Sequence, residues 1–415
     1  MLKFVKTIVA LALIATISVS ANAAGFSLYE WDARGNAMGG AVMANKASAA
    51  SISANPALIT QLEGNNLMAG LTIVSVNAKT IVGGQERAVE PAAFYIPNVY
   101  FAGNLNDNVY FGLGIFTRFG LGETYKDYKS WIGSYTSAYY ANLETFSINP
   151  NIAVKVNEEL SLAMGIEVMS LTFEEKKYAP AGALSPMIPV DGDFKLKGDS
   201  IAWGGNFGAF YNPKWAEKWA AGLTYRTKVR HVASGKVTAT GGYALVPGIE
   251  SGDAEAALVL PDSIAFGISF QATEKLILET NVTGTFWSSY DKLKIDYVSG
   301  TSLPTEHKNW NDVVKVAIGA EYNLTEKWDL RAGYFFDQSP INKNYMDTLV
   351  PAHDRNVFSV GAGHTFNESW GLDFSLAYLK AANVNGTLQT TGGPLPISYK
   401  DSSSMMFGLN ARYSF

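Results

Sequence analysis

The chain has 415 residues and no cysteine; 47% of its residues are hydrophobic, 17% are charged, and its formal net charge is -5. Beyond the first 23 residues no apolar run approaches the roughly 20 residues that a helix needs to cross a bilayer, which excludes a helical membrane protein. The negative charge argues against a nucleic-acid partner, and the 22 phenylalanines, 21 tyrosines and 9 tryptophans favour a chain made of β-strands.

Residues 1–23 have the pattern of a secretory signal peptide. Lys3 and Lys6 form a positive region before the apolar stretch Ile8–Val19. Ala21–Ala23 then provides the small residues of a cleavage site. We expect the mature, exported chain to begin at Ala24, and its lack of cysteine means that no disulfide stabilises it.

Residues 24–64 are rich in Ala, Gly, Ser and Asn and have no two-residue period. Such a segment would make a poor independent domain, but it could fill the lumen of a large barrel. We interpret it as a plug, or hatch. Within it Asn55 is placed to cap a short helix that begins at Pro56 and Ala57.

From about residue 65 onwards apolar and polar residues alternate with period two. Examples are Trp219–Arg230, Trp328–Asp337 and Met405–Phe415. This alternation is typical of a strand with one face in an apolar medium and the other in a polar medium. Most such segments have about 10 to 14 residues, which is long enough to cross a membrane at a tilt.

Short and long connections alternate between these segments. The short turns are Asn104–Asn108, Asn157–Glu159, Pro213–Glu217, Thr273–Glu274, Leu324–Glu326 and Asn367–Ser369. The long connections lie near Lys79–Glu90, Gly120–Tyr140, Phe173–Gly198, Ser234–Leu258, Tyr290–Asn309, Gln338–His353 and Ala382–Lys400. Short periplasmic turns and long external loops are typical of outer-membrane barrels.

Seven long and six short connections predict 14 strands. We therefore predict an all-β fold, in which residues 65–415 form a 14-stranded antiparallel transmembrane β-barrel. A small, partly helical N-terminal hatch, residues 24–64, plugs its lumen. Trp219, Trp328 and Trp370 follow short turns, where an interfacial aromatic girdle is expected, and the strand ending at Phe415 should close on the first strand.

The mature chain resembles the long-chain fatty acid outer-membrane transporters (FadL-type), whose relatives take up aromatic hydrocarbons. The resemblance rests on the order and spacing of the following segments: Ala24–Phe26, Asn55–Thr60, Ile96–Asn98, Gly120–Gly122, Tyr225–Val229, Arg331–Tyr334, Asp337–Pro340 and Val350–Arg355. It implies a 14-stranded barrel closed by an N-terminal hatch, the fold that the connections also predict.

The resemblance also implies a transport route. External loops would capture a hydrophobic ligand, an internal pocket at the mature N-terminus would bind it, and a kink of the third strand would release it sideways. Carried over to this sequence, the N-terminal residues are Ala24, Gly25 and Phe26, and the hatch motif is Asn55, Pro56 and Ala57. The kink and lateral exit correspond to Arg118, Phe119, Gly120, Leu121, Gly122 and Glu123.

Gly120 and Gly122 would interrupt the period of the third strand, since glycine permits a break or a bulge in a ladder. The alternative is that these glycines merely end a strand before a loop. A lateral exit suits an apolar ligand, which gains free energy in lipid and loses it in water.

Charged residues at inward positions of the strands are expected mainly to hold the hatch in place. They are Glu167, Arg226, Lys228, Arg230, Glu279, Lys315, Glu321, Asp329, Arg331, Asp373 and Arg412. Three of the cations, Arg226, Lys228 and Lys315, are the candidates for contact with a ligand carboxylate.

Residues for catalysis are not recognisable. The four histidines, His231, His307, His353 and His364, have no zinc-site spacing, and the expected interpretation is that they are surface or interfacial residues. No nucleophile elbow, P-loop or dinucleotide fingerprint occurs. We therefore expect neither enzyme activity nor a cofactor or metal.

The predicted function is passive uptake of hydrophobic small molecules, with fatty acid and aromatic hydrocarbon both left open. The expected partners are the substrate and outer-membrane lipid or lipopolysaccharide, around a monomer. A general diffusion porin is the alternative, and an outer-membrane enzyme such as a lipase or protease is a further one. The apolar residues of the segments Phe173–Gly198 and Ser234–Leu258 suit a capture groove.

Overall fold

A computed structural model describes residues 25–415 except for positions 127, 132–136 and 391–392. The predicted signal peptide, residues 1–23, and the predicted first mature residue, Ala24, lie outside the described residues.

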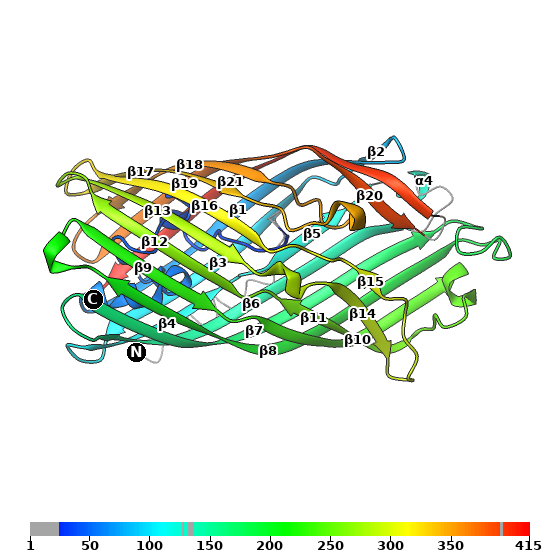
Figure 1. Ribbon diagram of the computed structural model, residues 1–415, viewed down its shortest axis with the longest axis horizontal. Coiled ribbons are helices and arrows are strands. Elements are labelled where there is room, and N and C mark those ends of the chain that lie inside the picture. Colours follow the sequence, from blue (N-terminus) through cyan, green and yellow to red (C-terminus); the bar gives the residue numbers. More distant parts are fainter. Residues whose placement is uncertain (1–24, 127, 132–136, 391–392) are drawn as a thin grey trace.

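The described residues form a closed antiparallel β-barrel of 14 strands, as predicted (Figure 1). Several strands consist of two segments each. The segments are β1 (Asn65–Val82), β2 (Gln85–Ala88), β3 (Ala92–Asn104), β4 (Val109–Phe116), β5 (Gly120–Thr124), β6 (Ser137–Lys155), β7 (Leu160–Ala179), β8 (Gly192–Tyr211), β9 (Trp219–Arg226), β10 (Val229–Gly241), β11 (Gly252–Leu260), β12 (Ser263–Gln271), β13 (Leu276–Thr285), β14 (Lys292–Tyr297), β15 (Glu306–His307), β16 (Val313–Asn323), β17 (Trp328–Asp337), β18 (Arg355–Thr365), β19 (Trp370–Ala381), β20 (Val384–Thr390) and β21 (Gly393–Ser414).

The last strand closes the barrel on the first. β21 pairs with β1 in a register that runs from Ser414 opposite Asn66 to Ile397 opposite Val82. The backbone N–H and C=O groups of the first and last strands are thus paired, which a strand inside a membrane requires. The predicted closure by the C-terminal strand is confirmed.

The barrel is apolar outside and polar inside. On β21 the side chains of Met405, Phe407 and Leu409 are 46%, 42% and 44% exposed, whereas Asn410 is fully buried. This arrangement confirms the face assignment made from the two-residue period. It also explains why the exposed apolar residues form a belt around the wall, because lipid rather than water is their medium.

All six predicted short turns lie between strands, and the predicted connection Gln338–His353 matches the interval between β17 and β18, but other predicted long connections are too long. β7 and β8 each have 20 residues, and they occupy most of the predicted loop Phe173–Gly198. β10 and β11 likewise occupy most of Ser234–Leu258. Strand pairing continues beyond the apolar belt, where both faces are mixed in polarity and the period that marks a strand in the sequence fades.

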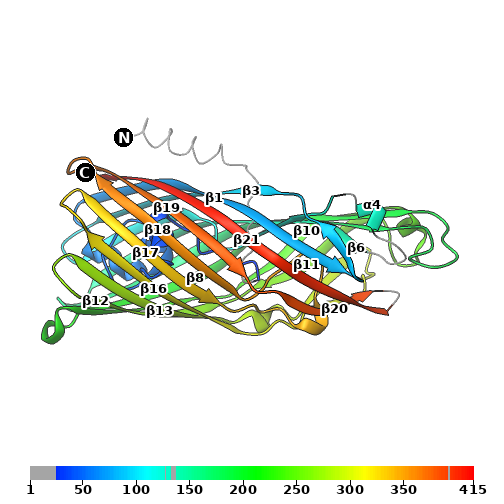
Figure 2. The same cartoon turned by 90° about the horizontal axis from the view of Figure 1, so that it is seen from above.

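Residues 25–64 lie inside the barrel, at the end where the short turns and the C-terminus are found (Figures 1 and 2). Their helices are α2 (Ala33–Ala37), α3 (Ser51–Ala54) and the 3-10 helix η1 (Pro56–Gln61). The other helices, in connections, are α4 (Tyr128–Trp131), η2 (Lys214–Ala216), η3 (Gly242–Leu245), η4 (Trp287–Ser289) and η5 (Lys343–Tyr345). In the part of the chain that the structure describes, no helix has the length and apolarity to cross a membrane.

Asn55 fixes the start of η1 and ties it to the wall. Its side-chain oxygen accepts a hydrogen bond from Ala57 N (3.1 Å), which confirms the predicted cap at Pro56. Its side-chain nitrogen donates to the carbonyls of Met43 (2.8 Å) and Ala209 (3.0 Å). A single buried amide therefore joins two parts of the hatch to β8.

Glycines of the wall make room for the hatch. A Cβ at Gly222 would lie 2.1 Å from the carbonyl oxygen of Met43, and a Cβ at Gly333 would lie 2.2 Å from Gly39 N. Further wall glycines whose Cβ would come within 3.0 Å of hatch atoms are Gly112, Gly208, Gly267, Gly319 and Gly361. Because these strands have no side chain at the contact, the hatch backbone can lie directly against the wall.

Candidate functional site

The N-terminal residues of the described chain lie in an aromatic cluster. Gly25 has φ +65°, and a Cβ there would lie 2.7 Å from the Trp310 ring and 2.8 Å from the Trp287 ring, so only glycine fits. Phe26 is buried, with its ring centroid 4.6 Å from that of Trp287 and 5.3 Å from that of Trp310. Of the predicted N-terminal site residues, Gly25 and Phe26 thus lie together, and Ala24 lies outside the described residues.

The third barrel strand is interrupted beside this cluster. β4 ends at Phe116, β5 begins at Gly120, and residues 117–119 leave the wall. Leu28 N donates to the Arg118 carbonyl (2.7 Å), and Gly120 N donates to the Phe26 carbonyl (2.9 Å). The N-terminal segment therefore takes the backbone hydrogen bonds that a neighbouring strand would otherwise satisfy.

The predicted cause of this break is wrong. Gly120 and Gly122 do not interrupt the strand, because both belong to β5 and pair with Glu144 and Asn142 of β6. The interruption precedes them. Its physical cause is that residues 26–28 form backbone hydrogen bonds with residues 118–120 in place of a neighbouring strand. No local sequence signal reveals this pairing.

The interruption leaves a gap in the barrel wall. β3 pairs with β4 only from Asn104 opposite Tyr110 to Val99 opposite Ile115, and among the described residues β5 pairs with β6 but not with β3. A cavity lies there, bordered by β3, β5 and β6. A hydrogen bond from Glu90 N to the Thr124 carbonyl (2.8 Å) closes the side of the gap near the loops.

Two further cavities meet at the N-terminal segment. The apolar cavity is lined by Phe26, Leu121, Ala141, Leu143, Leu171, Phe173, Glu175, Ala233, Ala256, Leu258, Tyr290, Leu293, Glu306, Lys308, Asp347, Leu349 and Val350. The hatch cavity lies between the wall and the hatch and is bordered by Ser27, Leu28, Phe119, Arg226 and Lys315, among others. Its lining is more polar because hatch backbone and lumen charges form it.

The structure brings two of the three predicted ligand cations to the hatch cavity. Arg226 donates hydrogen bonds to the carbonyls of Ile52 (2.8 Å) and Ser53 (2.9 Å), so it holds the end of α3. Lys315 is buried with its Nζ 3.6 Å from the Tyr29 ring centroid, and no ion pair joins it to any described residue. Lys315 is thus the cation that remains available in this cavity.

Lys228 does not join them, and its predicted inward orientation is wrong. Its side chain is exposed on the outer surface, as is that of Arg230. β9 ends at Arg226, and Thr227 exchanges two hydrogen bonds of 2.9 Å with Gly205 before β10 begins. This irregularity shifts the alternation by one residue, so that positions after it face the opposite way.

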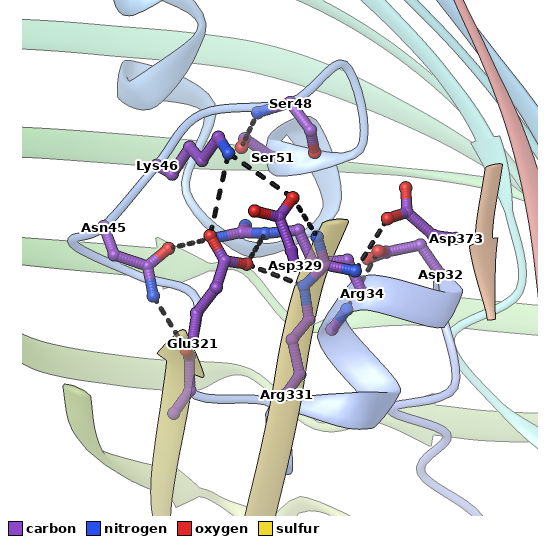
Figure 3. Close-up of polar contacts among 12 residues, drawn as sticks. Asp32, Arg34, Asn45, Lys46, Ser48, Ser51, Glu321, Asp329, Arg331 and Asp373 are labelled. Atoms are coloured by element: carbon purple, nitrogen blue, oxygen red, sulfur yellow. Dashed lines mark hydrogen bonds and ion pairs between the residues drawn. The ribbon is translucent and has the colours of Figure 1, made fainter. Parts of the chain in front are cut away.

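Other predicted inward charges fasten the hatch, which confirms that prediction for them. Glu321 accepts from Arg34 of α2 (2.9 Å) and from Arg331 (2.7 Å), as Figure 3 shows. Arg331 also pairs with Asp373 (2.7 Å), and Lys46 of the hatch lies 3.6 Å from Asp329. Glu279 accepts hydrogen bonds from the backbone of Met43 and Ala44.

Sequence reasoning missed a group of charges at one end of the apolar cavity. Glu175, Lys177, Glu306, Lys308 and Asp347 come from three separate parts of the chain, and only their alternation with apolar residues could have singled them out. Burial alone would lower the pKa of Lys308. The negative charges of Asp347 and Glu306 outweigh burial and hold that pKa well above its usual value.

Two histidines depart from the expected surface placement. His231 and His353 are buried, at 1% and 4% exposure. His231 pairs in register with Leu258 of the apolar cavity, and neither of its ring nitrogens has a hydrogen-bond partner among the described residues. Among the described residues no group of three or more His, Asp or Glu side chains could hold a metal ion.

The protein family described as outer membrane protein transport protein (OMPP1/FadL/TodX) matches residues 14–415. The chain belongs to this family. It is therefore a member of a family of outer-membrane transporters, as the sequence resemblance suggested. The long-chain fatty acid transport protein of Escherichia coli is 25% identical over 455 residues, covering 99% of each chain. Outer membrane protein P1 of Haemophilus influenzae is 27% identical over 472 residues and covers all of both chains.

Solved structures share the fold. A Pseudomonas aeruginosa FadL homologue superposes with a TM-score of 0.84 at 20% identity, covering 94% of this chain and 100% of that one. The Ralstonia pickettii toluene transporter TbuX gives a TM-score of 0.72 at 19% identity, covering 94% of this chain and 99% of that one. At such identities the likeness extends to the barrel and its hatch, not to the ligand.

Proposed function

We propose that this protein takes up hydrophobic small molecules passively through the outer membrane, as a monomer exported with a cleaved signal peptide. External loops capture the molecule, the apolar cavity binds it beside Phe26, and the gap between β3 and β5 releases it into the membrane. Family members whose names record long-chain fatty acid or toluene transport support this class of substrate.

The observation that carries the proposal is the position of the wall break. The segment that lines the apolar cavity at Phe26 is hydrogen-bonded to the residues where the third strand leaves the wall. Ala141 borders both the apolar cavity and the gap. A ligand at Phe26 is therefore one side chain away from lipid, where an apolar molecule is more stable than in water by about 25 cal/mol per Å² of apolar surface.

Filling the gap tests the release step. Gly122 borders the gap, and we expect Gly122→Trp to reduce uptake of a radiolabelled hydrophobic compound at least tenfold in cells that lack their own transporter. Binding by the purified variant should stay within about twofold of wild type, since the apolar cavity is untouched. Gly252→Trp is the control, because nothing lies within 4 Å of a Cβ there. Undiminished uptake by the Gly122 variant would place the exit elsewhere.

For ligands with an acidic group we propose Lys315 as the contact in the hatch cavity. It is the predicted cation that is both inward-facing and without an ion pair among the described residues. Lys315→Met should weaken dodecanoate binding about tenfold, the effect of one lost charge-assisted hydrogen bond. Lys228→Met, on the outer surface, should leave it unchanged. Equal effects of the two variants would contradict the assignment.

The outer wall is proposed to contact outer-membrane lipid or lipopolysaccharide. Arg230 of β10 and Lys228, which precedes that strand, are exposed on the outer surface, as are the apolar residues Ile201 and Trp203 of β8. Cations at the edge of an apolar belt suit lipid phosphates.

A further inference from the structure

The apolar cavity ends in a group of charges that together are negative. Its lining contains the carboxyl groups of Glu175, Glu306 and Asp347 but only one lysine, Lys308. Lys177 contacts two of these carboxyl groups, those of Glu175 and Glu306. All other lining residues are apolar or aromatic, so the charged end is where a ligand's polar group would be placed.

Both lysines at this end are already held by carboxylates. Lys308 Nζ lies 2.9 Å from Asp347 and 3.2 Å from Glu306. Lys177 Nζ lies 3.2 Å from Glu175 and contacts Glu306 as well. An incoming carboxylate would therefore have to displace an existing ion pair and would face three acidic groups against two cations.

One acidic oxygen of this group has no hydrogen-bond partner among the residues that the structure describes. It is Oε2 of Glu175, a residue that is 2% exposed and lines the cavity. A buried acceptor without a donor costs about 1 to 3 kcal/mol. A ligand that carries an O–H or N–H group could donate to Oε2 and remove this cost, whereas a carboxylate has no proton to donate.

The gap in the wall is also bordered by carboxyl groups, one of which is buried. Glu123 is buried and borders the gap, and its Oε1 has no hydrogen bond to any described residue. Among the described residues the lining of the gap includes Glu90 and Glu123 but no lysine or arginine. A molecule that leaves the apolar cavity past Ala141 therefore meets a second carboxyl group and no cation.

Resting on the proposed function, we propose that the apolar cavity selects uncharged hydrophobic molecules with a hydrogen-bond donor, such as aliphatic or aromatic alcohols, over carboxylates. Glu175 Oε2 accepts the ligand's O–H while the hydrocarbon part lies against Phe26, Leu143 and Leu258. Specificity comes from two sources. An alcohol satisfies the acceptor Glu175 Oε2, and the negative charge at this end of the cavity repels a carboxylate.

Dodecanol, dodecanoate and dodecane, which share a chain length, test this selection. Their affinities are measured at pH 8 on protein in nanodiscs by tryptophan fluorescence, since Trp287 and Trp310 contact Phe26 at the cavity. All measurements are made in a Lys315→Met background, which removes the free cation of the hatch cavity. We expect dodecanol to bind at least tenfold more tightly than dodecanoate and about fivefold more tightly than dodecane.

Two substitutions at one position separate charge from hydrogen bonding. Glu175→Gln keeps an acceptor and removes the charge, so dodecanoate should gain at least fivefold while dodecanol stays within twofold. Glu175→Leu removes both, so dodecanol should fall to the affinity of dodecane. If dodecanoate binds as tightly as dodecanol, or if Glu175→Gln leaves their ratio unchanged, the selection is overturned. If none of the three probes binds saturably, the proposed function fails with it.

Discussion

Glu321 joins three cations from different parts of the chain. Arg34 and Lys46 belong to the hatch, whereas Arg331 belongs to β17. Glu321, Arg34 and Arg331 are all buried, so the contacts of Glu321 with the two arginines are shielded from water and from salt. The hatch is therefore fastened at one point where the loss of a single carboxylate leaves two buried guanidinium groups short of a partner.

Glu321→Ala should accordingly lower the free energy of unfolding by about 3 kcal/mol or more. Urea titration of the protein in detergent micelles, followed by tryptophan fluorescence, measures the loss. Lys46→Ala is the control: its side chain is 51% exposed and its nitrogen lies 3.9 Å from Glu321, so it should cost less than about 1 kcal/mol. A similar loss of unfolding free energy in both variants would show that burial of the ion pairs does not increase their contribution to stability.

His353 makes the connection between β17 and β18 sensitive to acid. Its Nδ1 donates to the Ala382 carbonyl (2.5 Å), and its Nε2 lies 3.3 Å from the Ser402 hydroxyl. Burial lowers the pKa of His353 from 6.5 to about 4. The folded connection therefore favours neutral His353, whereas the opened connection allows the ring to be protonated below pH 6.5. The free energy that keeps the connection closed has its full value above pH 6.5 and decreases as the pH falls from 6.5 towards 4.

Between these limits the local stability should decrease by about 3 kcal/mol. Amide protection of residues 350–354, measured by hydrogen exchange and corrected for intrinsic rates, should therefore be lower at pH 4.5 than at pH 7.5. His353→Phe should remove the dependence. A wild-type protection that does not change with pH would mean that His353 is protonated without opening the connection.

At the scale of elements, the wall glycines decide how the hatch is seated. Gly222 on β9 and Gly333 on β17 are places where two backbones touch. A side chain at either position would push the hatch out of contact, and the Asn55 hydrogen bonds to Met43 and Ala209 would be lost with it. A side chain cannot be inserted between two closely packed segments unless one of them moves.

Gly222→Val should therefore destabilise the hatch, with a loss of about 3 kcal/mol or more in the free energy of unfolding. Trypsin cleavage after Lys46, which is slow while the hatch is seated, should become rapid. Gly252→Val is the matched control, because its Cβ would meet nothing within 4 Å. Should both variants resist trypsin equally, the close approach at Gly222 is not what seats the hatch.

In the third strand the position of the break was predicted correctly, but its cause was not. The sequence placed a break at Arg118–Glu123, and the structure interrupts the strand at residues 117–119. The family resemblance placed it there, and the glycines that were predicted to cause it are ordinary members of β5. The strand propensity of residues near 118 carries no information about backbone hydrogen bonds with residues 26–28, which are about 90 positions away in sequence.

At the scale of the whole molecule, a hatch inside a 14-stranded barrel should block ions. In planar bilayers the wild-type protein should show no large steady conductance, whereas Gly222→Val should show frequent openings because its hatch is loosened. Single-channel recording of the two proteins under the same salt and voltage measures the difference. A large steady conductance of the wild type would instead favour the general diffusion porin.

The sequence by itself determined the barrel, its 14 strands, the face that meets lipid and the short turns. Each of these depends on a local pattern, because the side chains of a strand alternate between two media with a fixed period. Where the period slips, as it does between Arg226 and Lys228, the same rule gives the wrong face.

Only the tertiary structure decided which charges are free and where the wall opens. Lys315 has no ion pair with any described residue, and Arg226 holds α3. Glu175 lies beside an apolar cavity whose lining comes from β5, β6, β7, β10, β11, β14, β15 and several connections. Whether a buried charge has a partner depends on residues that are distant in sequence. The chemistry of the site is therefore set when the barrel closes around its own N-terminal segment.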